Sequence, residues 1–220
     1  MKIFITSLLL LFLFQGFAQK VPSKNYPDEE YWSVVSKRAA KIVQSLNLNN
    51  TEKEKKVQNI IAFQYYDLNK IHDSAKLENA KIKEGNIGEE LKKEQTEKIK
   101  QDVEKKLEKL HKSYISKLQK ELADQQIELV KNGMTYNVFV NTYAGYLDML
   151  PNLTDEQKKY IYDALLEARE KAMDAGSSNE KHAWFGKYKG RINNYLSKAG
   201  YDLNKESKDW HERLKAREQK

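Results

Sequence analysis

Apolar residues recur at spacings of three and four along most of the chain, and charged or polar residues occupy the positions between them. Such spacing lines apolar side chains along one face of an α-helix. The pattern predicts helices that begin near residues 27, 51, 89, 154 and 177, and a last amphipathic helix that carries Trp210 and Leu214. Only one segment shows strand-like alternation, and no second strand offers it a partner. We therefore predict an all-α, multi-helix bundle.

Short polar signals mark where several of these helices begin. A Ser or Thr followed three residues later by Glu or Gln is typical of a capping box, in which each side chain binds the other residue's backbone N–H. The signal occurs at Thr51 with Glu54, at Thr154 with Gln157 and at Ser177 with Glu180. The run from Gly85 to Gly88 predicts a turn between two helices.

A long charged helix is predicted from Glu89 to about Leu122, with a narrow seam of apolar residues. At about 1.5 Å per residue this helix would extend about 50 Å. Two arrangements would bury the seam. The helix packs against the preceding one as an antiparallel hairpin over residues 51–122, which we favour, or it dimerises the chain as a coiled coil.

The C-terminal half, residues 124–220, is less charged and more aromatic, and it predicts a compact helical unit. Within it, residues 134–150 leave two interpretations open. Alternation from Thr135 to Tyr143 would fit a strand. The spacing of the apolar residues fits a helix better; these are Tyr136, Val140, Tyr143, Leu147 and Leu150.

Residues 1–18 have the features of a secretory signal peptide. Lys2 precedes an apolar run that ends at Phe14, and the small residues Gly16 and Ala18 fit a cleavage site. Roughly 12 apolar residues are too few to span a bilayer of about 30 Å. The chain has no Cys, which excludes a lipid-modified N-terminus and disulfides. We expect residues 19–220 to form a single helical domain, periplasmic or secreted, without a membrane span.

The net charge narrows the choice of partner. The chain has 39 Lys and Arg against 32 Asp and Glu, a formal net charge of +7. Nucleic acid would fit this charge, but export and the interleaving of Glu with Lys argue against it, so acidic polysaccharide is the better expectation. The four His, at positions 72, 111, 182 and 211, lack metal-ligand spacing. We expect neither a metal nor a cofactor.

The segment from Ala175 to Asp202 concentrates the chemistry of the chain. From Lys181 to Lys198 it contains cations and no carboxylate. At about 100° per residue, its large apolar residues form a core face. Two stripes lie opposite this face: one of His182, Gly186, Lys189 and Asn193, with Gly190 beside it, and one of Lys187, Arg191, Asn194 and Lys198. Glycine weakens a helix, so both glycines indicate that a ligand or a neighbouring helix comes close.

Both stripes suit an anionic sugar. Lys and Arg bind carboxylate or sulfate, and Asn can donate to and accept from hydroxyl groups. The predicted ligand-binding residues are Lys187, Lys189, Arg191, Asn193 and Asn194. His182 and Tyr195, the latter at the edge of the core face, are the candidates for a catalytic base.

Four stretches carry a resemblance to a known family: Asn132 to Thr154, the overlapping LTDEQ from Leu153 to Gln157, AREKAMDAGSS from Ala168 to Ser178, and the run from Glu180 to Asp202. They resemble a family of exported bacterial proteins that is defined only as a domain of unknown function. The resemblance implies a signal peptide, a helical body, and a genomic setting among systems that degrade uronate- and rhamnose-containing polysaccharides of pectin or ulvan type. It implies no catalytic residues.

Three functions remain open at this point. The first is a periplasmic accessory protein of polysaccharide utilisation that binds acidic oligosaccharide without cleaving it, and we favour this one. The second is a uronate lyase in which His182 or Tyr195 removes a proton while Lys189 and Arg191 neutralise the sugar carboxylate. The third is a structural envelope protein that associates with itself through the long helix.

Overall fold

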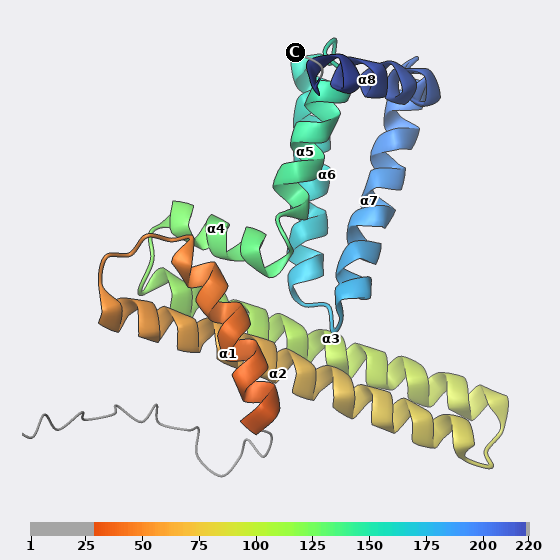
Figure 1. Cartoon of the computed structure of the whole chain (residues 1–220). Helices are drawn as coiled ribbons and strands as arrows, with labels where there is room; N and C mark the ends of the chain where they lie inside the picture. Colours follow the sequence, from red (N-terminus) through yellow and green to blue (C-terminus); the bar gives the residue numbers. More distant parts are fainter. Residues whose placement is uncertain (1–28, 219–220) are drawn as a thin grey trace, which may run out of the picture.

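The computed structural model describes residues 29–218, so the predicted signal peptide lies outside the described residues. Over this range the chain forms eight α-helices and no strand, which confirms the all-α prediction (Figure 1). The helices are α1 (Glu29–Gln44), α2 (Thr51–Glu84), α3 (Glu89–Gln119), α4 (Asp124–Met134), α5 (Val138–Met149), α6 (Asp155–Met173), α7 (Ser178–Lys198) and α8 (Leu203–Glu218). None of these helices is long and apolar enough to cross a membrane.

The long hairpin is formed by α2 and α3, which pack against each other, and α1 packs against α2 (Figure 1). The capping box is confirmed in full at Thr154. Ser177 is the N-cap of α7 and accepts the N–H of Glu180, but the Glu180 side chain accepts the N–H of Gly176 at 2.8 Å instead of that of Ser177. At α2 the prediction was one residue late. Asn50 accepts the N–H of Lys53 at 2.9 Å, so Asn50 is the N-cap and Thr51 is already helical.

The first hydrophobic core occupies only one end of this hairpin. The buried side chains of α2 end at Leu68, and those of α3 begin at Tyr114. Beyond them the arm is charged, and its larger apolar side chains are open to solvent: Leu77 is 64% and Leu91 50% exposed. Surface ion pairs within one helix contribute only a few tenths of a kcal/mol each. The arm therefore depends mainly on helix propensity and on its contact with the partner helix.

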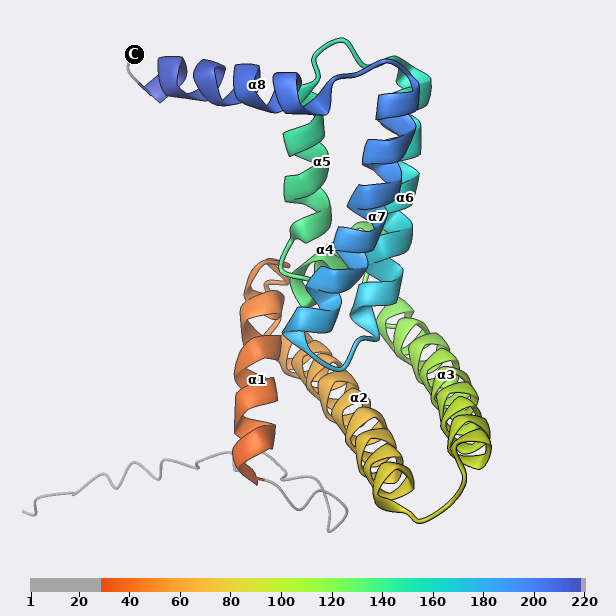
Figure 2. The same cartoon turned by 90° about the vertical axis from the view of Figure 1, so that its right-hand side faces the viewer.

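The second hydrophobic core is formed by α5, α6 and α7, which stand across the hairpin (Figures 1 and 2). α6 packs against both of the other helices. α8 lies across the far ends of α5 and α7 and has no fully buried residue. Asp148 anchors it by accepting from Trp210 Nε1 at 2.7 Å and from Arg217 Nη2 at 2.9 Å.

The chain passes from the first core to the second through α4 and a sharp reversal. Tyr136 and Asn137 have φ angles of 58° and 56°, in the left-handed region. This conformation ends α4 and starts α5 in a new direction (Figure 1). Most of the segment 134–150 is therefore helical, as its apolar spacing favoured, with α5 over Val138–Met149. The residues that alternate belong to the turn at 135–137 and to the start of α5.

Candidate functional site

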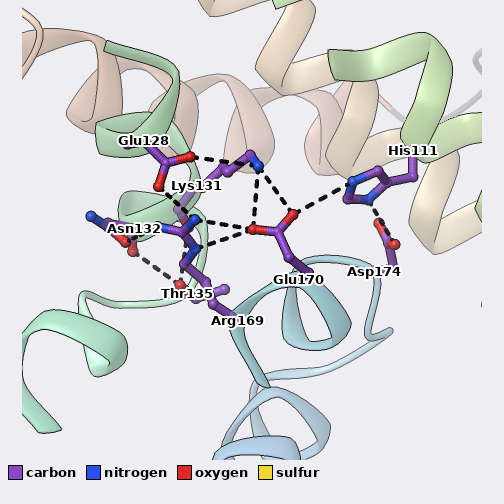
Figure 3. Close-up of polar contacts among 8 residues, drawn as sticks. All are labelled: His111, Glu128, Lys131, Asn132, Thr135, Arg169, Glu170 and Asp174. Carbon is purple, nitrogen blue, oxygen red and sulfur yellow. Dashed lines mark hydrogen bonds and ion pairs between the residues drawn. The ribbon is translucent and has the colours of Figure 1, made fainter. Parts of the chain in front are cut away.

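Arg169 lies where the two cores meet, and its side chain is only 1% exposed. Its Nη2 donates to Glu128 Oε2 at 2.6 Å and to Glu170 Oε1 at 3.0 Å, and its Nη1 donates to Asn132 Oδ1 at 2.8 Å (Figure 3). The guanidinium also lies 5.1 Å from the centre of the Phe139 ring. Arg169 of α6 thus binds α4 and contacts α5 at once, and its buried charge is compensated by two carboxylates.

The charged network continues from Arg169 towards the hairpin. Lys131 Nζ donates to Glu170 Oε2 at 3.1 Å, so Glu170 is held by two cations. His111 of α3 lies next to it: its Nε2 is 3.7 Å from Glu170 Oε2, and its Nδ1 is 2.8 Å from Asp174 Oδ2 (Figure 3). The network therefore joins α4, α6 and α3.

The hydrogen bond that His111 Nδ1 donates to Asp174 is the main cause that raises the pKa of His111 above its ordinary value of 6.5. The negative charges of Asp174 and Glu170 act in the same direction, whereas burial and the charge of Lys131 oppose them. The charged imidazolium is therefore the form that the folded protein stabilises.

Because the pKa of His111 is higher in the folded state, its contribution to stability should depend on pH. The contribution is present in full below the ordinary value of 6.5 and is lost as pH rises through the raised folded value. The difference in unfolding free energy between wild type and His111→Asn, from urea titrations at several pH values, should shrink over this window. A difference that stays constant with pH would contradict the assignment. Burial lowers the pKa of Lys181 to about 8, so its contribution to stability increases as pH rises, at higher pH than that of His111. This contribution is present in both proteins and therefore cancels when wild type and His111→Asn are compared.

The turn between α6 and α7 is held by two further contacts, one to the hairpin and one between α7 and the end of α6. His72 Nε2 lies 2.8 Å from the carbonyl oxygen of Asp174. Lys181, only 5% exposed, donates to the carbonyl oxygens of Ala172 at 2.9 Å and Met173 at 3.1 Å, the free carbonyls at the end of α6. Lys181 begins the carboxylate-free run of cations noted in the sequence, but its side chain is buried and caps the end of α6.

A cleft of about 950 Å³ opens between α3 and the joined ends of α6 and α7. His111, Asp174 and Glu170 form part of its wall. Trp184 and Lys187 of α7 also line it. The Lys187 ammonium lies 5.1 Å from the centre of the Trp184 ring. The lining contains five carboxylates and three lysines besides His72 and His111. A concave site that combines an aromatic ring with charged donors and acceptors suits a polar ligand with a ring face.

The first predicted stripe of α7 is open to solvent. His182, Lys189 and Asn193 are exposed, and a Cβ added at Gly186 or Gly190 would meet nothing within 4 Å. The glycines therefore do not admit a neighbouring helix. Two members of the stripe contact α5 or the turn before it. His182 stacks on Tyr136, with ring centres 5.6 Å apart, and Asn193 Oδ1 accepts from the Tyr146 hydroxyl at 2.6 Å.

The second stripe is divided between different surroundings. Lys187 lines the cleft, and Asn194 and Lys198 are exposed. Arg191 lies 3.6 Å from Glu167 and 4.7 Å from the centre of the Tyr188 ring. The Glu167 carboxylate therefore already compensates part of the Arg191 charge.

The two candidates for a catalytic base lie far apart. Tyr195 is half-buried and stacks on Tyr160 with ring centres 3.9 Å apart, on the side of α7 away from His182. Both residues belong to α7 and are about 20 Å apart along its axis, at about 1.5 Å per residue. One reaction centre cannot contain both.

No pattern in the sequence marks the residues of the cleft wall as a site. His111 and Asp174 are 63 positions apart and come together only because α6 ends on the hairpin. The one local signal was Lys187, which belongs both to the predicted ligand-binding residues and to the lining of the cleft. Among residues 29–218, no group of three or more His, Cys, Asp or Glu side chains is arranged to hold a metal ion.

Comparison with known proteins gives one finding. No curated protein matches the chain. A family model does match, described as protein of unknown function DUF3826, over residues 32–216, a range that includes the hairpin, the charged network and the cleft. Since the match spans far more than half of the 220 residues, the chain belongs to the DUF3826 family of proteins of unknown function.

Proposed function

We propose that the protein is an exported accessory protein of polysaccharide utilisation that binds acidic, uronate-containing oligosaccharide along α7 and into the adjoining cleft. One observation carries the proposal: Lys187 lies both on the carboxylate-free face of α7 and on the rim of the cleft. A sugar chain bound there could place its carboxylate at Lys187 and a ring in the cleft. The setting in polysaccharide utilisation comes from the family resemblance.

The charges of α7 favour an anionic ligand. Its only carboxylate, Glu180, lies in the first turn, and the exposed residues after it are cationic or neutral. Lys189 is exposed and has no ion-pair partner among the described residues. Gly186 and Gly190 leave the helix backbone uncovered between these cations, so a flat sugar ring can approach closely. Uronate carboxylates would meet lysines there, and the exposed Asn194 amide suits hydroxyl groups.

The cleft adds an apolar surface and hydrogen-bond acceptors. Trp184 is half-buried, and the position of Lys187 over its ring keeps a cation beside an apolar surface. The carboxylates on the α3 side of the cleft, such as Glu104 and Glu108, would repel a second acid but accept hydrogen bonds from hydroxyls. The cleft therefore offers acceptors for the hydroxyl groups of a sugar whose carboxylate lies at Lys187.

Calorimetry with oligoglucuronate and oligogalacturonate tests the proposal. The double variant Lys187→Ala with Lys189→Ala should bind at least about 10-fold more weakly, since each step of 1.4 kcal/mol is a factor of ten. Added salt should weaken wild-type binding, because exposed charges are screened. Lys100, a lysine of the hairpin arm whose side chain is 62% exposed, provides the matched control: Lys100→Ala should bind like wild type. No heat with either ligand, or equal affinity of all three proteins, would refute the proposal.

A further inference from the structure

We infer that His111 is a catalytic base in the cleft and that it cleaves a bound 4-linked glucuronate chain by β-elimination. The inference rests on the proposed binding of an acidic glycan in the cleft, and it goes beyond the accessory role by making the protein a lyase. It replaces His182 and Tyr195 as base, because His111 is the residue that combines a place in a large cleft with an orienting carboxylate.

Asp174 prepares His111 for this role. Its Oδ2 lies 2.8 Å from His111 Nδ1 and accepts the Nδ1 proton, which leaves the lone pair of the neutral imidazole on Nε2. The other oxygen, Oδ1, is buried and has no hydrogen-bond partner among the described residues, so the carboxylate has His111 as its main side-chain partner. Asp174 is therefore a positioning residue that fixes the tautomer and stabilises the imidazolium formed when Nε2 takes a proton.

Nε2 of His111 has no hydrogen-bond partner among the described residues, and His111 lines the cleft. Its nearest acid is Glu170, whose Oε2 is 3.7 Å away, too far for a hydrogen bond. Glu170 is engaged elsewhere, by Lys131 at 3.1 Å and by the buried Arg169 at 3.0 Å. Glu170 thus lies beside the imidazole without accepting a hydrogen bond from Nε2 (Figure 3).

The cleft lining supplies the two groups that elimination from a uronate needs. Elimination needs only a base and a cation that neutralises the uronate carboxylate, because this neutralisation makes the C5 proton more acidic. Lys187, beside Trp184 on the cleft rim, can neutralise that carboxylate.

The step balances with His111 alone. Nε2 removes the C5 proton, the electron pair forms the C4–C5 double bond, and the C4–O4 bond breaks. The imidazolium returns its proton to the departing O4, so His111 ends neutral. One group can serve as base and then as acid only if the C5 hydrogen and O4 lie on the same face of the ring. This holds for 4-linked glucuronate, and in 4-linked galacturonate the two groups lie on opposite faces.

The test follows the ultraviolet absorbance of the unsaturated product during incubation with poly-(1→4)-glucuronate and, separately, polygalacturonate. Wild type should release product from the glucuronate polymer only. His111→Asn and His111→Gln should lower the rate by about 100-fold or more, while calorimetric affinity for oligoglucuronate stays within a few-fold of wild type. His211→Asn, an exposed histidine of α8, is the matched control and should keep full activity.

Asp174→Asn separates positioning from a purely structural role. Loss of the carboxylate should lower the pKa of His111, so the acidic limb of the kcat/KM profile should move to lower pH and the rate should fall. Binding without product, product from galacturonate alone, or undiminished activity in both His111 variants would overturn the inference and leave the proposed function standing. Neither binding nor product would refute both.

Discussion

Replacement of Arg169 by Leu is expected to lower the free energy of unfolding by about 3–5 kcal/mol, the range found when one partner of a buried ion pair is removed. The side chain is 1% exposed, and it binds Glu128, Glu170 and Asn132. Leu would leave the buried amide oxygen of Asn132 without its donor, and Glu170 would keep only Lys131 as a close cation. Urea titration followed by circular dichroism measures the loss.

Two variants decide whether the geometry of the guanidinium is responsible. Arg169→Lys keeps the charge but cannot donate to three acceptors in one plane, so it should recover only part of the lost stability. Arg191→Leu removes an arginine of similar chemistry from the exposed side of α7, where the side chain is 51% exposed and 3.6 Å from its carboxylate. This control should cost at most about 1 kcal/mol. Equal losses for Arg169→Leu and Arg191→Leu would show that the buried network contributes little.

The helices could be predicted because their signals are local. Thr154 and Ser177 cap their helices through the residue three positions later, a contact that the sequence displays directly. The α2 cap was misplaced by one residue because Asn50 competes with Thr51 for the same function and Asn is the better N-cap. The helical state of α5 was also favoured by local spacing. Its strand-like alternation includes the left-handed turn at Tyr136 and Asn137, and the periodicity of apolar residues cannot reveal such a turn.

The exposure of α7 was accessible to sequence reasoning, and the cleft was not. A rotation of about 100° per residue separates the buried Phe185 and Ile192 from the exposed Lys189. The same rotation cannot show that Lys181 caps the end of α6, because this depends on how tightly the chain turns. His111 has ordinary helical surroundings on α3, and its acidic partner is set by the docking of α6 on the hairpin.

The burial of Arg169 could not be predicted from the sequence either. The spacing of Ile161, Leu165, Ala168 and Ala172 marks the inner face of α6, and Arg169 is adjacent to it. A charged residue beside a core stripe normally reaches solvent. Here α4 covers it and supplies Glu128 and Asn132, a contact between residues about forty positions apart that only the folded arrangement creates.

Replacement of Gly176 by Ala is expected to destabilise the protein by about 1–3 kcal/mol, the usual cost of overpacking. A Cβ at this position would lie 2.6 Å from Cγ and 3.0 Å from Cβ of His72. The imidazole would have to move, which would break its contact with the Asp174 carbonyl at 2.8 Å and loosen the α6–α7 turn on the hairpin. Thermal unfolding followed by circular dichroism measures the change.

Gly186→Ala is the matched control, because the same methyl group is added where nothing lies within 4 Å. Inside a helix Ala is more stable than Gly by about 1 kcal/mol, so this variant should raise stability. The two substitutions therefore have opposite signs, and the difference reports the approach of the turn to α2. Combination with His72→Ala identifies the cause: if the clash with the imidazole is responsible, Gly176→Ala should cost much less in the His72→Ala background. An unchanged cost would locate the strain in the turn backbone.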